Sequence, residues 1–199
     1  MKQQPGFSLL ELLLELLLAC SLGLVLLAVA LQALLAEQRL GGRIGVLLRQ
    51  RQLLLRANQL ITADLERGIA LAPELMPSCN LSGRQLFMQI LSTDGELTTY
   101  TVGAAPSAIW QGQVLMRCGP AYGLDGQVSP GGSHQNRVVL DGLPQDFRAW
   151  SGCQLPTPHS NAQLTVCWEP ASGLVQWQLQ LQSDGVSAQR DGQALLKSG

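Results

Sequence analysis

The chain has 199 residues, of which 46% are apolar and only 14% charged, and its 13 basic side chains nearly balance 14 acidic ones. This composition excludes an intrinsically disordered chain, which combines high charge with few apolar residues. It also argues against nucleic-acid binding through bulk electrostatics. The average hides an uneven distribution, because leucine dominates the first third whereas all four tryptophans lie after residue 86. Two differently composed parts are therefore expected.

A long apolar segment covers residues 7–36 and carries only two charges, Glu11 and Glu15. Residues 16–36 contain no charge at all, and about 20 apolar residues suffice for a helix to cross a bilayer. The segment exceeds the apolar core of a secretory signal peptide, which has about 7–15 residues. It predicts a single transmembrane helix in contact with membrane lipid, rather than the buried core helix of a soluble protein.

Directly in front of this segment stand the residues Gly6-Phe7-Ser8-Leu9-Leu10-Glu11. They resemble the prepilin cleavage and methylation motif of type IV pilins and type II secretion pseudopilins. The resemblance implies a leader peptide of residues 1–6, which prepilin peptidase removes by cutting after Gly6 on the cytoplasmic side. It also implies N-methylation of Phe7 and a filament-core helix formed by residues 7–36.

The same resemblance makes Glu11 the acidic residue that is the hallmark of the family. A carboxylate inside the bilayer costs about 2.5–3.5 kcal/mol on insertion scales, so such a residue needs a partner or a function. The implied partner is the amino-terminal charge of Phe7 in a neighbouring subunit. The alternative is that the Glu11 carboxylate only reaches the cytoplasmic surface of the membrane.

Glu15 departs from the usual pattern of the family. It lies four residues after Glu11, on the same face of the expected helix. Two carboxylates at this spacing repel each other, so we expect one of them to be protonated in the membrane. Two roles are open for Glu15: it assists Glu11 in assembly and helix registration, or it is tolerated near the membrane interface.

The flanking charges oppose the topology that the motif implies. Five arginines and one acidic residue lie between Glu37 and Arg56, whereas Lys2 and the amino terminus are the positive charges before the segment. Flanking charge alone would place the arginine side in the cytoplasm. We nevertheless expect a cytoplasmic N-terminus in a bacterial inner membrane and a periplasmic or extracellular head. The motif requires a cytoplasmic Gly6, and the cysteines of the head suit an oxidising exterior.

The helix is expected to continue beyond the membrane as an amphipathic segment. Residues 37–72 place apolar side chains at three- and four-residue steps, and no proline interrupts this pattern before Pro73. Gly41, Gly42 and Gly45 are the weak point of the helix, and we expect a flexible joint there. One face of the later half should pack on a globular domain.

From Pro73 onward, short segments with β-type patterns alternate with turn residues. The predicted strands are 84–92, 96–102, 114–118, 137–140, 146–150, 163–169 and 174–182. The last of them alternates Val175, Trp177, Leu179 and Leu181 with glutamines, which is typical of a half-buried antiparallel strand. The predicted fold class is α+β, in which a long N-terminal helix packs on an antiparallel sheet. The β-rich head covers residues 73–182, and residues 183–199 are expected to form a mobile tail.

This layout resembles a pilin head, and further residues are similar to the larger minor subunits. These subunits are the J-type pseudopilin of type II secretion and the W-type minor pilin of type IV pili. The similar residues are Tyr100, Leu115-Met116-Arg117, Val138–Leu143 with Phe147, and Ile61–Arg67. The resemblance implies a minor pilin or pseudopilin with a priming, tip or adaptor role. Its implied partners are other pilins, prepilin peptidase and the inner-membrane assembly platform.

Four of the five cysteines lie in the head, and none of them forms a C-x-x-C pair, which argues against zinc and thioredoxin-like sites. An even number in an exported domain favours two disulfides, for which three connectivities exist. We expect the local pairs Cys79–Cys118 and Cys153–Cys167. The alternative is four buried free thiols. Cys20, inside the membrane segment, is expected to be an apolar filler.

No motif supports an enzyme. Ser133-His134 lacks the G-x-S-x-G elbow, and the two histidines show no metal-ligand spacing. We therefore predict no catalytic residue, no metal and no cofactor. The alternative function is a single-pass membrane anchor that presents a β-rich binding module for polysaccharide or DNA.

The tryptophans of the head bear on this alternative, because they can stack on sugars. Trp150, Trp168 and Trp177 lie in strand patterns and are expected in the core, so only Trp110 lies free in a loop. A nucleic-acid site is not evident, since the head from Pro73 onward has six basic and nine acidic residues.

Overall fold

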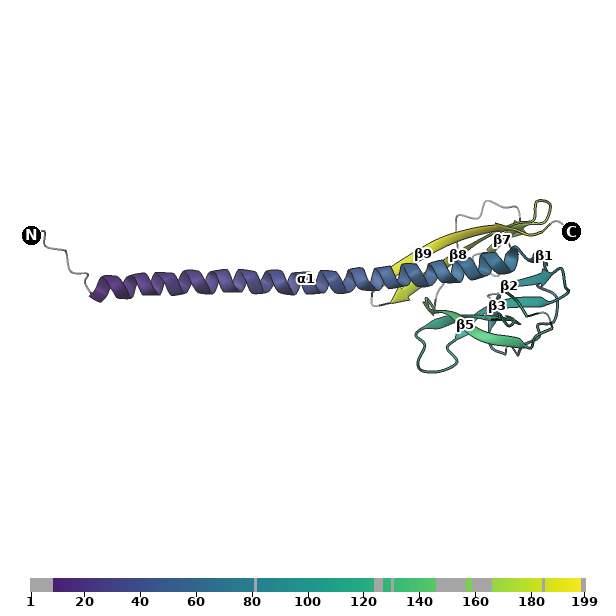
Figure 1. The fold of residues 1–199 in the computed structure, drawn as a ribbon, viewed down its shortest axis with the longest axis horizontal. Coiled ribbons are helices and arrows are strands. Elements are labelled where there is room, and N and C mark those ends of the chain that lie inside the picture. The colour runs from purple at the N-terminus through teal and green to yellow at the C-terminus, as the bar shows by residue number, and fades with distance from the viewer. Residues whose placement is uncertain are drawn as a thin grey trace, which may run out of the picture. The chain divides into compact units, whose positions relative to one another are not determined.

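The computed structural model describes residues 9–80, 82–123, 127–129, 131–145, 157–158, 166–183 and 185–197. The chain divides into two compact units, Met1–Val46 and Leu47–Gly199. The described part of the first unit is the beginning of helix α1 (Leu9–Leu65). The second unit contains the rest of α1 and two antiparallel sheets (Figure 1). One long apolar N-terminal helix followed by antiparallel sheets confirms the predicted α+β class.

Helix α1 has 57 residues and is helical through Gly41, Gly42 and Gly45. It ends at Leu65 and not at residue 72, so the predicted C-terminal end is wrong. Residues after it form strand β1 (Gly68–Leu71) instead. Gly68 explains the change, because a Cβ atom there would lie 2.4 Å from Cγ2 of Ile90 in the neighbouring strand. A larger residue at this position would clash with the Ile90 side chain, so glycine is favoured here.

The first sheet has five strands in the order β1-β2-β3-β4-β5, with antiparallel neighbours. After β1 follow β2 (Gln85–Ser92), β3 (Leu97–Ala104), β4 (Gln113–Pro120) and β5 (His134–Leu143). These four strands confirm the predictions for their segments. A tight turn joins β2 to β3, in which Gly95 has a φ of 75° and donates its N–H to the Ser92 carbonyl at 3.1 Å.

The second sheet has the order β6-β7-β8-β9. Its strands are β6 (Thr157–Pro158), β7 (Val166–Glu169), β8 (Leu174–Ser183) and β9 (Val186–Leu195). Strand β9 corrects the prediction of a mobile tail over residues 183–199, because it pairs with β8 along its whole length. Strand β9 lacks the alternation of apolar and polar residues that marks β8. The residues opposite the apolar side chains of β8 are small or charged, namely Ala188, Arg190 and Gly192. The strand predicted over residues 146–150 lies outside the described residues.

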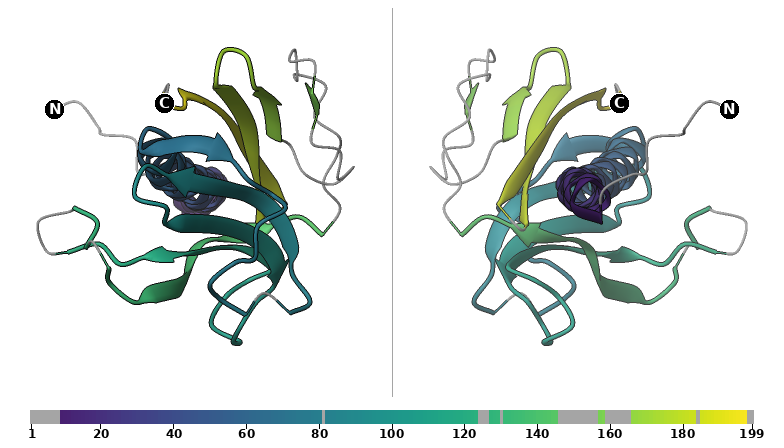
Figure 2. Two further views of the ribbon diagram at one scale, coloured as in Figure 1. Left: turned by 90° about the vertical axis from the view of Figure 1, so that its right-hand side faces the viewer. Right: turned by 90° about the vertical axis from the view of Figure 1, so that its left-hand side faces the viewer.

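Within the second unit, α1 lies between the two sheets (Figure 2). The buried face of the helix presents Leu54, Ala57, Ile61 and Leu65 to one continuous apolar core. Both sheets contribute to this core, with the fully buried Trp177 of β8 among its largest side chains. The buried face also contains two polar residues, Gln50 and Asp64, which the apolar stripe did not predict.

Candidate functional site

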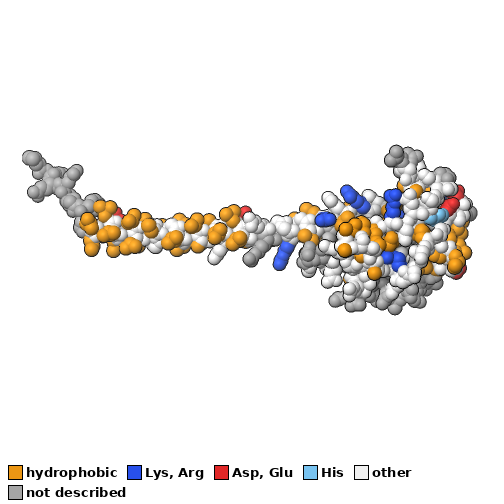
Figure 3. All heavy atoms as spheres, turned by 90° about the horizontal axis from the view of Figure 1, so that it is seen from below, with side chains coloured by type: hydrophobic (Ala, Val, Ile, Leu, Met, Phe, Trp, Pro, Cys, Tyr) orange, Lys and Arg blue, Asp and Glu red, His pale blue; other side chains and the backbone are white. Residues whose placement is uncertain are grey.

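The first unit of the chain presents an apolar helical surface. Its large aliphatic side chains from Leu9 to Leu35 are exposed, and Figure 3 shows them covering this part of α1. Among the described residues, α1 is the one helix that is long and apolar enough to cross a membrane. About 20 such residues are enough for one crossing. By length and composition, α1 can therefore anchor the chain in a membrane with a single pass.

The two membrane-segment carboxylates lie near the start of this helix. Glu11 is in its first turn, and Glu15 follows four residues later, so both lie on one helix face. Both side chains are exposed. Gly6 and Phe7, the predicted cleavage and methylation residues, lie outside the described residues. The structure thus places the acidic members of the predicted site at the beginning of the apolar surface.

A second polar site lies in the head, where α1 meets the first sheet. Its centre is the carboxylate of Asp64, whose side chain is completely buried. Arg117 of β4 donates its Nε to Oδ2 at 2.7 Å and its Nη2 to Oδ1 at 3.0 Å, which makes a bidentate ion pair. Tyr100 of β3 donates its hydroxyl to Oδ2 at 2.5 Å. The last turn of the helix is therefore joined to two central strands by charge-assisted hydrogen bonds.

Two further side chains complete this site. Tyr122 donates its hydroxyl to Asp64 Oδ1 at 2.9 Å, and Arg67 forms an ion pair with the same oxygen. The two arginine guanidiniums lie over the Tyr122 ring, with Arg117 at 4.8 Å and Arg67 at 5.2 Å from its centroid. These distances are those of cation–π contacts. We call the five residues Asp64, Arg67, Tyr100, Arg117 and Tyr122 the Asp64 cluster.

The electrostatics of the Asp64 cluster favour a charged carboxylate. Burial raises the pKa of Asp64, but the hydrogen bonds and charge of Arg117, with hydrogen bonds from Tyr100 and Tyr122, outweigh it and lower this pKa. Burial and the negative charge of Asp64 raise the pKa of Tyr100 well above its usual value. The tyrosines are consequently neutral donors at neutral pH, and Asp64 is an anion held between two cations.

The sequence did not reveal the Asp64 cluster as a site, although four of its members lie in segments that the sequence analysis singled out, residues 61–67, Tyr100 and residues 115–117. The signal was present in two places. Asp64 follows Ile61 by three residues and therefore shares its buried face. Tyr100 and Arg117 stand opposite each other in neighbouring strands, so their side chains point to the same face. Only the strand register brings these residues together.

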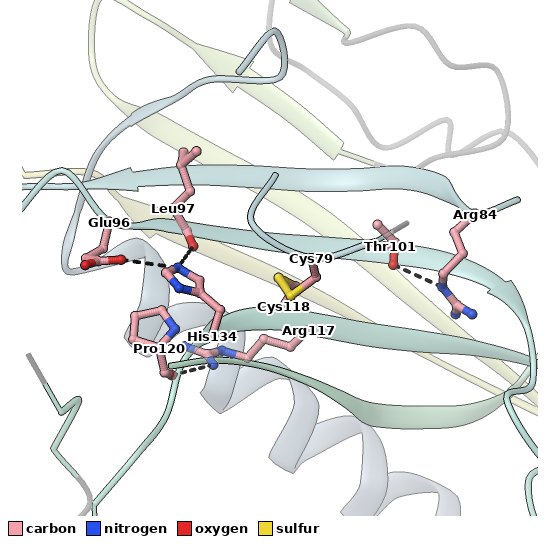
Figure 4. Close-up of a disulfide and its surroundings, with 9 residues drawn as sticks. All are labelled: Cys79, Arg84, Glu96, Leu97, Thr101, Arg117, Cys118, Pro120 and His134. Atoms are coloured by element: carbon pink, nitrogen blue, oxygen red, sulfur yellow. Dashed lines mark hydrogen bonds and ion pairs between the residues drawn. A yellow bond between two sulfur atoms is a disulfide. The ribbon is translucent and has the colours of Figure 1, made fainter. Parts of the chain in front are cut away.

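The predicted disulfide between Cys79 and Cys118 is confirmed, with a Cα–Cα distance of 6.1 Å (Figure 4). It ties the segment after β1 to the central strand β4, directly beside Arg117. Cys167 is also disulfide-bonded, and its predicted partner Cys153 lies outside the described residues. Cys20 is free and exposed on α1.

His134 has a structural environment in the part of the chain that the structure describes. Its Nε2 atom lies 3.2 Å from Glu96 Oε2 and 3.2 Å from the Leu97 carbonyl oxygen (Figure 4). These contacts join the start of β5 to the start of β3. Among the described residues, no group of three or more His, Cys, Asp or Glu side chains could hold a metal ion.

Comparison with protein-family models, with curated proteins and with solved structures gives no match for this chain. The functional interpretation therefore depends on the apolar helix, on the residues in front of it and on the head.

Proposed function

We propose that this chain is a minor pilin or pseudopilin, a structural subunit of a type IV pilus-like or type II secretion filament. The observation that carries the proposal is the motif from Gly6 to Glu11, which stands at the start of an exposed apolar helix. An α+β head around the later part of α1 supports it further. The proposed role is assembly, in which the subunit primes, caps or adapts a filament.

The chemistry of the motif explains how assembly follows from processing. Prepilin peptidase hydrolyses the bond between Gly6 and Phe7 and leaves an amino group on Phe7, which is then methylated. In the filament, this positive group pairs with the Glu11 carboxylate of a neighbouring subunit. The pair removes the cost of leaving either charge alone in a water-poor core. The aliphatic surface of α1 supplies the contacts between helices, and repeated head-to-tail contacts of this kind generate a helical filament.

The proposed topology has the N-terminus in the cytoplasm and the head in the periplasm or outside the cell. The disulfide between Cys79 and Cys118 supports this orientation, because such bonds persist in oxidising compartments. The proposed partners are other pilins or pseudopilins, prepilin peptidase, the inner-membrane assembly platform and membrane lipid.

The N-terminus of the mature protein tests the proposal directly. We expect mass spectrometry of the chain purified from a host with prepilin peptidase to show N-methyl-Phe7 as the first residue. A peptidase-deficient host is the control and should retain Met1. An intact Met1 in the competent host would contradict the assignment.

A variant of Glu11 separates a filament subunit from a plain membrane anchor. Glu11→Ala should remain in the membrane and be cleaved, yet it should not enter filaments, because the Phe7 amine loses its partner. Glu37→Ala, an exposed carboxylate further along α1, is the matched control and should assemble. Normal assembly of Glu11→Ala would contradict the pairing of Glu11 with Phe7. Absence of the wild type from filaments, with both variants stable in the membrane, would favour the alternative, a single-pass anchor that presents a binding module for polysaccharide or DNA.

A further inference from the structure

A groove in the head lies between α1 and β5 and has a volume of about 330 Å³. Arg56 and Leu60 line it from the helix, Arg117 and Tyr122 from β4 and the residues after it, and Arg137 and Val139 from β5. Three arginines thus surround a cavity that has an apolar wall and one aromatic ring. No carboxylate is among the described residues that line it.

The two outer arginines of the groove have no partner in the part of the chain that the structure describes. Arg56 and Arg137 are exposed and form neither a hydrogen bond nor an ion pair within the described residues. Arg137 also stands directly opposite Arg117 in the β4–β5 register. Like charges in directly opposite positions destabilise a sheet. Because Asp64 already neutralises Arg117, Arg137 is the cation of this pair that an anion bound on this face of the sheet would neutralise.

Arg117 is the inner arginine, and the Asp64 cluster holds it in position. Only 6% of it is exposed, and it donates to both Asp64 oxygens and, at 3.0 Å, to the Pro120 carbonyl. These bonds use three of the five N–H groups of a guanidinium. The Asp64 cluster thus holds the inner guanidinium of the groove in a fixed position before a ligand binds, which reduces the entropy lost on binding.

The groove differs in charge from the head that contains it. From Pro73 onward the sequence has six basic and nine acidic residues. Among the described residues, Asp64 is the one carboxylate that pairs with Arg117, and it also pairs with Arg67. A chain of phosphates would place charge against the apolar wall formed by Leu60 and Val139, which is unfavourable. A short segment with carboxylates at the arginines and aliphatic side chains on the apolar wall matches both features of the groove.

We infer that this groove binds an extended acidic and aliphatic peptide segment of a partner protein. Carboxylates of the segment pair with Arg56 and Arg137, and its aliphatic side chains contact Leu60 and Val139. This inference does not depend on processing at Gly6 or on filament assembly, so the two proposals can fail separately.

Fluorescence anisotropy with the full chain in detergent micelles tests the inference. The probe is a fluorescein-labelled six-residue peptide that alternates Glu and Val, and the control peptide has Gln in place of Glu. We expect saturable binding of the Glu peptide and none of the Gln peptide. Arg137→Gln and Arg56→Gln should each weaken binding by about tenfold, as the loss of one charge-assisted hydrogen-bond pair predicts.

Arg190→Gln is the matched control, because it removes one exposed arginine of β9 that does not line the groove. It should leave the affinity unchanged. Equal binding of both peptides, absence of saturable binding, or equal weakening by Arg137→Gln and Arg190→Gln would each overturn the inference. Tighter binding of a single-stranded oligonucleotide or of inorganic phosphate would also overturn it. So would self-association of the wild type that Arg137→Gln abolishes, since a second copy would then occupy the groove.

Discussion

Asp64 concentrates more polar contacts than any other described side chain of the head. Its two oxygens accept from Arg67, Tyr100, Tyr122 and, twice, from Arg117. A buried ion pair contributes little net stability relative to apolar residues of the same shape, because both ions lose their hydration. Removal of one partner is different, since the other charge is left buried and unpaired. The Asp64 cluster is therefore expected to control whether the helix end docks on the sheet.

The first prediction concerns Asp64→Asn, which removes the negative charge and leaves Arg117 buried. We expect the free energy of unfolding of the head to fall by about 3–5 kcal/mol. Urea unfolding of the full chain in micelles, followed by the fluorescence of the buried Trp177 and the other tryptophans, measures this change. Glu66→Gln, an exposed carboxylate two residues away, is the control and should change stability by less than about 0.5 kcal/mol. Equal effects of the two variants would contradict a central role for Asp64.

The second prediction is the pH dependence of the same site. The pKa of Asp64 is lowered in the folded state from an ordinary value of 3.8. A lowered pKa means that the unfolded chain binds the proton more tightly, so the contribution of Asp64 is present above this ordinary value. It is lost as the pH falls through the lower folded pKa. The difference in unfolding free energy between wild type and Asp64→Asn should hence be constant near neutral pH and decrease below about pH 4. A difference that stays constant down to about pH 2 would disagree with this assignment.

The third prediction concerns Gly192, at the contact between β9 and the helix. A Cβ atom at this position would lie 2.2 Å from Asn58 Oδ1 and 2.3 Å from the Trp177 ring. Gly192→Ala should lower the stability of the head by about 1–3 kcal/mol, because a well-packed core resists added atoms. Gly45→Ala is the control, since nothing lies within 4 Å of a Cβ there and alanine favours a helix. Thermal unfolding midpoints of the two variants distinguish these outcomes.

At the scale of elements, the local pattern of apolar and polar residues predicted most strands. It did not predict β9 or the end of α1, which depend on contacts with residues distant in the sequence. The alternation of Val175, Trp177, Leu179 and Leu181 was sufficient to predict β8 and its buried face. Strand β9 was missed because its partner residues include Arg190 and Gly192, which carry no apolar signal. The helix end was misplaced because Ile69 continues the helical spacing, whereas Gly68 permits a strand through its contact with Ile90, a partner more than twenty residues away.

The disulfide between Cys79 and Cys118 acts on elements, since it closes a loop over 39 residues that contains β2 and β3. In the chain-entropy model, a loop of this length contributes about 4 kcal/mol. The double variant Cys79→Ala with Cys118→Ala should therefore unfold at a clearly lower urea concentration than the wild type. Cys20→Ala, at the exposed cysteine outside the head, is the control and should not shift the midpoint. An unchanged midpoint for the double variant would show that packing alone holds this segment.

At the scale of the whole molecule, the low charge of the chain has two separate origins. The described part of residues 9–36 is an exposed aliphatic helix with Glu11 and Glu15 as its only charges. The head instead buries its apolar residues around α1 and both sheets. The sequence predicts this division into an apolar helix and a head, because a run of apolar residues can be recognised from neighbouring positions alone. The Asp64 cluster and the basic groove were not predictable in the same way, since Asp64, Arg117 and Arg137 meet only through the fold.

Two features of the whole chain disagree about which side of the membrane the head occupies, and a labelling experiment can measure this topology. The arginines after residue 36 favour a cytoplasmic head. The proposed processing motif from Gly6 to Glu11 and the disulfide favour an external one. We expect the motif to prevail. Ile109→Cys, at an exposed site in the turn after β3, should react with a membrane-impermeant maleimide in intact spheroplasts when Cys20 is replaced by Ala. The parent with Cys20→Ala alone is the control and should react in neither intact nor lysed cells, because its remaining cysteines are expected to be disulfide-bonded. Labelling only after lysis would place the head in the cytoplasm and remove the basis for export into a filament.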